Sequence, residues 1–176
     1  MMFEANTVEP SDRMLIAIGA FALNWSVMEM GLDFWAAVVW HQYGGKLTAK
    51  ENPKNLGRKV EFLRDCQTKC PALEPVAAAS LLHLSEVDAL TTTRHHIVHG
   101  AAHGVGEDGS LHLVRLNHDK RGLHTADEII LSIEEVEDGA ARAKALAHRI
   151  LTLGIALDSV AKSVNRSDET DGELAV

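Results

Sequence analysis

The sequence is poor in cysteine and has no excess of basic residues. Its two cysteines, Cys66 and Cys70, stand four residues apart, and one turn of helix suits a disulfide poorly. We therefore expect reduced thiols in a cytoplasmic protein. Lysine and arginine number 17 against 25 acidic residues, which gives a formal net charge of −8. This balance excludes a large basic face for non-specific nucleic-acid binding, but it allows a small basic cleft.

The first residues also lack the basic segment with which a secretory signal peptide begins, so we expect no such peptide. The apolar run from Met14 to Trp40 is long enough to span a bilayer. However, the run contains Asn24, Glu29 and Asp33, which are costly in lipid. We therefore predict no membrane association, and a helix that is apolar on most sides and lies centrally in a helical bundle.

The composition is typical of one soluble globular domain. The chain has 176 residues, of which 46% are hydrophobic and 24% are charged. We find no internal repeat. We expect a flexible arm over residues 1–10, a single helical domain over residues 11–164, and a disordered acidic tail over residues 165–176.

The first two helices have recognisable start signals. Ser11 and Asp12 are residues that commonly cap a helix N-terminus, and the apolar segment that follows them extends to residue 42. Asn52 could cap the second helix, because Pro53 suits its first position. The second helix carries one apolar stripe and an opposite charged face, which indicates a helix at the protein surface.

The last two helices are delimited in the same way. Pro71 or Pro75 opens the third helix, and Gly100 is placed to help end it. Ser132 and Glu135 form the S-x-x-E pattern of a capping box ahead of a long apolar-periodic segment. This segment predicts the fourth helix.

The segment of about residues 101–131 differs from the rest, because it is rich in glycine and in alternating or β-branched residues. We predict a β-hairpin with strands at about 111–117 and 127–132. The loop between the strands has a basic tip with Lys120 and Arg121. The expected fold is therefore all-α: an up-down four-helix bundle with a small β-hairpin inserted between the third and fourth helices.

The heptapeptide "RHHIVHG", residues 94–100, concentrates one arginine and three histidines. A metal site is one interpretation, since His95, His99 and His103 are spaced i, i+4 and i+8. Gly100 and Gly104 make one continuous helix past residue 100 doubtful, the zinc-protease pattern H-E-x-x-H is absent, and no cysteine or carboxylate stands nearby in sequence. We therefore predict no metal and no cofactor.

A purely structural role is a second interpretation. The helical spacing places Arg94 on the apolar side of the third helix, where an arginine needs a partner. Glu29, inside the apolar first helix, is a plausible one, because a buried glutamate should itself be paired. The histidines would then solvate a helix end, where protonated imidazole is favourable.

A catalytic role is the third interpretation. Arg94, His95 and His99 fit the pattern R-φ-x-x-x-H, in which φ is commonly Asn, Asp or His. This motif, its "IVHG" ending and its place at the end of the third long helix resemble the HEPN superfamily (higher eukaryotes and prokaryotes nucleotide-binding). The segment "LNWSVMEMGL", residues 23–32, is similar to the first-helix W-x-x-x-E region of several HEPN families.

The resemblance implies a metal-independent ribonuclease, often a toxin or defence component, that works as a homodimer on RNA. It assigns catalytic roles to Arg94 and His99 and polar support to His95, while His96 is a supporting residue that faces solvent. Lys120 and Arg121 are weaker candidates for RNA contact. The resemblance also implies an alternative, a catalytically inactive module that binds nucleotides or proteins, and in either case an antitoxin or nucleotidyltransferase partner.

The chemistry of RNA cleavage suits these residue types. The 2′-OH attacks the adjacent phosphate, a histidine can move the protons, and an arginine fork can hold two phosphate oxygens. On an ideal helix, however, five residues turn by about 500°, which leaves Arg94 and His99 about 140° apart. We therefore expect either an unwound helix end or a site shared between two chains.

Overall fold

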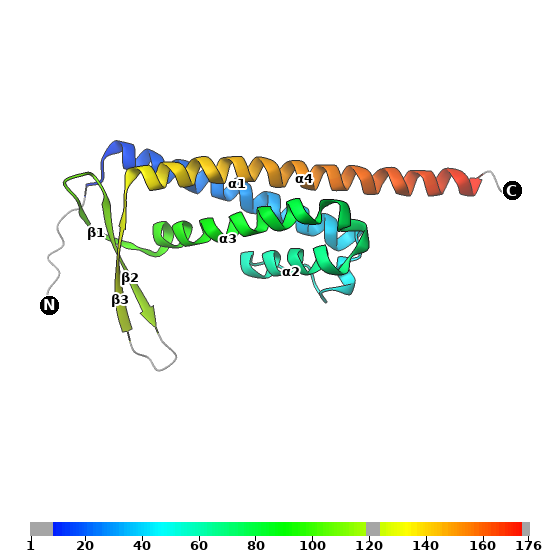
Figure 1. The fold of residues 1–176 in the computed structure, drawn as a ribbon, viewed down its shortest axis with the longest axis horizontal. Coiled ribbons are helices and arrows are strands. Elements are labelled where there is room, and N and C mark those ends of the chain that lie inside the picture. Colours follow the sequence, from blue (N-terminus) through cyan, green and yellow to red (C-terminus); the bar gives the residue numbers. More distant parts are fainter. Residues whose placement is uncertain (1–8, 119–123, 174–176) are drawn as a thin grey trace. The chain divides into compact units, whose positions relative to one another are not determined.

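The computed structural model describes residues 9–118 and 124–173. The described residues are mostly helical and contain four α-helices, three β-strands and two short 3₁₀ helices (Figure 1). The α-helices are α1 (Asp12–Gln42), α2 (Leu56–Lys69), α3 (Ala77–His99) and α4 (Ile133–Glu173). The strands are β1 (Ala101–Val105), β2 (Leu111–His118) and β3 (His124–Leu131), and the 3₁₀ helices cover Gly45–Leu47 and Pro71–Val76. The predicted number of α-helices is confirmed, and the up-down bundle stays a prediction.

The chain divides into two compact units. The first, which we call the sheet unit, comprises Met1–Trp25 and Asp88–Lys144 and so contains all three strands. The second, the helical unit, comprises Ser26–Val87 and Ala145–Val176. Each unit buries its own set of apolar side chains. In the sheet unit these include Met14, Phe21, Trp25, Leu90, Leu113 and Val136, and in the helical unit Met28, Trp35, Leu63, Leu84, Leu146 and Ile150.

The sheet has three antiparallel strands in the order β1-β2-β3. Strands β2 and β3 pair from Leu111 with Leu131 to His118 with His124, close to the predicted hairpin. Strand β1 was not predicted, because its sequence "AAHGV" lacks the alternation that signals a strand and has one β-branched residue, Val105, at its end. The insertion is therefore a three-stranded sheet, and the prediction of a two-stranded hairpin was incomplete because it left out β1. Lys120 and Arg121 lie outside the described residues.

Gly100 ends α3 by allowing a close approach. Its backbone N–H still donates to the His96 carbonyl at 2.9 Å, and β1 begins one residue later. A Cβ at this position would lie 2.6 Å from the His96 oxygen and 3.0 Å from the Leu113 side chain. The glycine is required because β2 packs directly against the helix end.

The predicted starts of α1 and α4 are met. The Ser11 hydroxyl accepts from the Met14 N–H at 3.2 Å, as expected of an N-cap. Ser132 and Glu135 form the predicted capping box, in which the Ser132 N–H donates to the Glu135 carboxylate at 2.8 Å and the Glu135 N–H to the Ser132 hydroxyl at 3.2 Å.

The start of the second helix was predicted wrongly. Asn55 caps α2, with its side chain accepting from the Arg58 N–H, so the helix begins three residues beyond the position that Asn52 and Pro53 suggested. The preference of proline for the first helical position favoured Asn52, but Pro53 lies ahead of the helix, and Asn55, which was not considered, is the cap.

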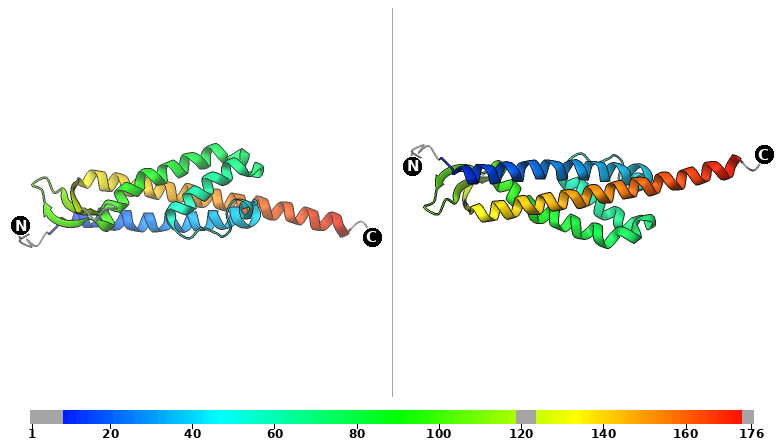
Figure 2. Two further views of the ribbon diagram at one scale, coloured as in Figure 1. Left: turned by 90° about the horizontal axis from the view of Figure 1, so that it is seen from below. Right: turned by 90° about the horizontal axis from the view of Figure 1, so that it is seen from above.

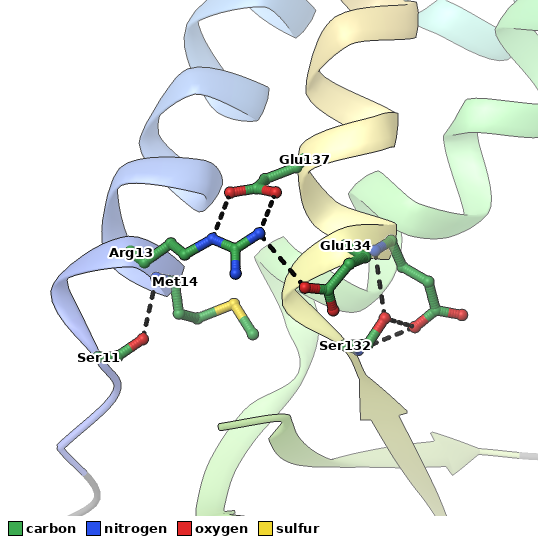
Figure 3. A network of polar contacts seen from close by, with 7 residues as sticks. Ser11, Arg13, Met14, Ser132, Glu134 and Glu137 are labelled. Carbon is green, nitrogen blue, oxygen red and sulfur yellow. Dashed lines mark hydrogen bonds and ion pairs between the residues drawn. The ribbon is translucent and has the colours of Figure 1, made fainter. Parts of the chain in front are cut away.

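An ion-pair network joins the starts of α1 and α4 within the sheet unit (Figure 3). The Arg13 guanidinium donates two hydrogen bonds to the Glu137 carboxylate, at 2.8 and 2.6 Å, and lies 3.3 Å from Glu134. This fork lies on the surface, so it contributes modestly to stability.

Helix α1 is apolar on most sides, as predicted, but it is not covered on most sides, so the prediction that it lies centrally was wrong. One side of the helix is buried, but another exposes a row of apolar side chains: Leu15, Ile16, Leu23, Val27, Met30 and Phe34. Among the described helices, α1 alone is long and apolar enough to cross a membrane by length and composition, with a mean hydropathy of 1.5 over its most apolar window. Two of its polar side chains have partners within the protein, since Asn24 donates to the Ala140 carbonyl and Asp33 pairs with Lys59.

Helix α4 continues to Glu173 (Figure 2). It therefore includes most of the segment for which the sequence indicated a disordered tail. Two glycines of α4 allow close packing, since a Cβ at Gly154 would lie 2.9 Å from the Phe34 ring and one at Gly139 would lie 3.2 Å from the Phe21 ring. Cys66 and Cys70 are free, as predicted, and both are buried. Burial raises the pKa of the Cys66 thiol to about 12.

Candidate functional site

The candidate site occupies the last two turns of α3, in the sheet unit. Arg94, His95 and His96 are half-buried, whereas His99 is exposed. The helix is regular up to His99, so the expected unwinding before Gly100 does not occur.

Arg94 and His99 meet within one chain. The Arg94 Nη1 atom lies 3.4 Å from the His99 Nε2 atom. The ideal helical angle did not predict this contact, because it describes where side chains leave the backbone and not how far a long arginine reaches around the helix. A guanidinium and an imidazole that converge on one exposed point can together approach a single anionic group.

His95 lies beside this pair. Its ring and the His99 ring have centroids 4.7 Å apart and planes tilted by 54°. Partial burial lowers the pKa of His95, and the nearby positive charges of His99, Arg115, His96 and Arg94 lower it further. His95 and the four basic residues just named form a small positive area on an acidic protein. We call this area the helix-end cluster. This is the local exception that the net charge of −8 leaves open.

His96 is turned elsewhere. It lines a surface pocket of about 370 Å³ together with residues of α3, β3 and α4, among them Thr92, Ile130, Asp138 and Arg142. His96 is therefore partly buried and is not fully exposed to solvent.

The pairing of Arg94 with Glu29 stays a prediction. Glu29 is half-buried on the part of α1 that belongs to the helical unit, whereas Arg94 belongs to the sheet unit. The contact recorded for the Arg94 guanidinium is the one with His99.

The structure contains a second cluster of histidines that was not predicted from the sequence. His103 was considered as a continuation of the helical row His95–His99, but it lies on β1, where its Nε2 atom is 3.6 Å from the Glu128 carboxylate. His112 on β2 also approaches Glu128, with its Nδ1 atom 3.5 Å from the same oxygen. The alternation in "SLHLVRLNH" signalled that His112 faces away from the core, but only the strand pairing brings the three residues together.

No family model, curated protein or solved structure matches this chain. The HEPN resemblance therefore rests on the sequence alone: the R-φ-x-x-x-H motif with its "IVHG" ending, its place at the end of the third long helix, and the W-x-x-x-E region of residues 23–32.

Proposed function

We propose that this protein is a HEPN-like, metal-independent endoribonuclease that acts as a homodimer. The observation that carries this proposal is the convergence of Arg94 and His99, 3.4 Å apart, at an exposed helix end. Cleavage of RNA needs a group that transfers protons near neutral pH and a cation that stabilises the phosphorane. These two side chains supply both.

The proposed reaction uses the substrate's own nucleophile. His99 accepts the proton of the ribose 2′-OH as the 2′-oxygen forms a bond to the adjacent phosphorus. Arg94 holds the non-bridging oxygens through its planar fork while negative charge develops on them. The bond from phosphorus to the 5′-oxygen then breaks, and a protonated histidine gives that oxygen a proton. The products are a 2′,3′-cyclic phosphate and a 5′-hydroxyl.

A homodimer would provide both histidines that this reaction needs. One copy of His99 would act as the base and the copy from the second chain as the acid, on either side of one phosphate. The sheet unit exposes apolar side chains that such a dimer could bury: Ile16 and Leu23 are each 71% exposed, and Val98, next to His99, is 54% exposed.

Cleavage of a mixed RNA substrate in EDTA tests the proposal. We expect the wild-type protein to cut RNA in EDTA and to leave cyclic phosphate ends, and the Arg94→Ala and His99→Ala variants each to lose about 100-fold or more of this activity. His41→Ala is the matched control, because His41 is exposed at the end of α1 in the helical unit. Cleavage that requires a metal, or that survives in both Arg94→Ala and His99→Ala, would overturn the mechanism.

Sedimentation of the wild type and of Leu23→Lys tests the homodimer. We expect a dimer for the wild type and weaker self-association for the variant, with a parallel loss of cleavage. A folded, dimeric wild type that does not cut RNA would instead favour the alternative, an inactive HEPN-like module that binds nucleotides or proteins.

A further inference from the structure

We infer that the sheet carries a site for a divalent transition metal of the zinc class, built from His103, His112 and Glu128. Each strand contributes one ligand: His103 comes from β1, His112 from β2 and Glu128 from β3. Imidazole nitrogen and carboxylate oxygen are the donors that zinc takes alongside thiolate. The inference stands independently of the proposed ribonuclease activity.

The spacing of the donor atoms fits a metal ion. One ligand atom from each of the three residues lies within 4.8 Å of the other two. Two bonds of about 2.0–2.1 Å at a tetrahedral angle separate their donors by about 3.3–3.4 Å. The Glu128 oxygen lies 3.6 Å from the His103 nitrogen and 3.5 Å from the His112 nitrogen, so small side-chain movements would close the triad around a metal.

The strand register explains why the three side chains share one face. His112 lies between the buried Leu111 and Leu113, so it points to the opposite, outer face of the sheet. Glu128 pairs with Val114, which makes it a diagonal neighbour of His112 on that face. The β1–β2 pairing is irregular between Ala102 and Gly104, and His103 is the extra residue there. Such bulges commonly re-aim a side chain, and here the His103 and His112 rings are nearly perpendicular, at 83°, with centroids 6.1 Å apart.

The turn between β1 and β2 orients the His112 ring. The Ser110 hydroxyl donates to the Asp108 carboxylate at 2.6 Å and lies 3.5 Å from the His112 Nε2 atom. Asp108 is held in turn by the Ser110 backbone N–H at 3.0 Å, and Gly109 supplies the positive φ of 80° that this tight turn needs. With Nε2–H donating to Ser110, the lone pair of Nδ1 points toward Glu128. A second group that fixes the ring in this way is the usual support of a metal-binding histidine.

This arrangement calls for a positive charge between Nδ1 and the carboxylate. Two acceptor atoms that face each other at 3.5 Å repel unless a proton or a metal cation lies between them. A metal cation satisfies all three residues at once, whereas one proton can serve only one contact. Binding would also tie the three strands together, so it should stabilise the sheet unit.

Titration of zinc chloride into the full-length, EDTA-treated and dialysed protein tests the site. We expect one zinc per chain by calorimetry, a rise in thermal stability on binding, and an intense visible absorption when cobalt(II) replaces zinc. We expect affinity to fall at least about 100-fold in His112→Ala and in Glu128→Gln, and about 10-fold in Asp108→Asn, because loss of a supporting partner costs less than loss of a ligand. Circular dichroism would establish that each variant is folded.

His95→Ala is the matched control, because it removes a histidine from the other cluster of the sheet unit. We expect it to bind zinc like the wild type, since the positive groups around His95 repel a cation. Three results would overturn the inference: no binding by the folded wild type, unchanged affinity in folded Glu128→Gln and His112→Ala, or a loss of binding in His95→Ala alone.

Discussion

The sheet unit contains two pairs of histidines with opposite surroundings. The His95–His99 pair lies beside Arg94, and the His103–His112 pair lies around Glu128. Imidazole can accept a proton, donate one or bind a metal, so its neighbours decide which it does. Positive neighbours make the helix-end cluster suited to an anion such as a phosphate. The negative neighbour makes the sheet cluster suited to a cation.

The two clusters are also built by different means. Arg94 and His99 belong to one helix, so their contact depends on local geometry and on the reach of one long side chain. The sheet cluster instead depends on the register of three strands and on the bulge at His103. Substitutions in the sheet should therefore affect the sheet cluster more than the helix-end cluster. The exception is a substitution of a residue that supports both clusters.

Leu113 is that residue, and its truncation should have the largest effect. It is 3% exposed on β2, pairs with Ala102 and Ile129, and lies against Gly100 at the end of α3. Leu113→Ala should lower the free energy of unfolding by about 2–5 kcal/mol, because it leaves a cavity in the core of the sheet unit. Thermal or urea denaturation would measure this loss.

Leu116→Ala provides the control for that change. Leu116 is on the same strand but 65% exposed, so its truncation should change stability by no more than about 0.5 kcal/mol. Equal losses for the two variants would contradict the view that Leu113 supports both clusters. We expect Leu113→Ala to weaken both RNA cleavage and zinc binding, whereas Leu116→Ala should leave both unchanged.

Replacing Arg94 by lysine should separate the two clusters. The substitution keeps the charge but removes the planar fork that can hold two phosphate oxygens. We expect RNA cleavage to fall roughly 10- to 100-fold, a barrier increase of about 1.4–2.7 kcal/mol, with no change in zinc affinity. Steady-state cleavage assays and zinc titration on one preparation would measure both.

Arg142→Lys is the control for the fork, because Arg142 makes an exposed ion pair with Asp138 on α4. It should leave cleavage within about twofold of the wild type, as expected for a surface ion pair. If Arg94→Lys cut RNA as fast as the wild type, the fork would have no role. If it also bound zinc more weakly, the two clusters would not be separate.

The difference in construction explains what the sequence could predict. Ser11 and the Ser132–Glu135 capping box were recognised because they act within a few residues of chain. The candidate residues Arg94 and His99 came from a local motif, but their contact did not, since it depends on side-chain reach. Strand β1 was missed because its pairing with β2, rather than its own residues, makes it a strand.

The largest errors concern contacts between distant parts of the chain. The exposed row on α1 is as apolar as its buried side, so composition and period could not show which side is covered. The cluster of His103, His112 and Glu128 required the strand register and a bulge, and neither is written in the spacing of the three residues. Local sequence signals therefore found the helix-end cluster and could not find the sheet cluster.

Loss of the Ser132 cap should have a smaller effect and should fall on the sheet cluster. Ser132 follows the last residue of β3 and caps α4, so it holds the end of the strand that carries Glu128. Ser132→Ala should lower the free energy of unfolding by about 1 kcal/mol. Ser85→Ala, in the middle of α3 and exposed, is the control and should cost less than about 0.5 kcal/mol. In Ser132→Ala we expect weaker zinc binding and unchanged RNA cleavage. Weaker RNA cleavage with unchanged zinc affinity would mean that α4 supports the helix-end cluster instead.

The smallest expected effect is on the titration of His95. It tests whether the helix-end cluster is positively charged. Partial burial, followed by the charges of His99, Arg115, His96 and Arg94, lowers the pKa of His95 below the ordinary value of 6.5. The unfolded chain then binds the proton more tightly than the folded one. The contribution of His95 to stability is therefore complete above the ordinary pKa and is lost as the pH falls from 6.5 through the lowered value.

An NMR titration of the histidine rings would measure the pKa of His95 directly. His99→Ala should raise it only part of the way to 6.5, because burial is the largest cause of the shift and the other charges remain. A full return to 6.5 would assign the whole shift to His99 and would contradict a cluster of several positive groups. An unshifted pKa in the wild type would remove the positive field on which the contrast between the two clusters rests, since a cation could then bind at either one.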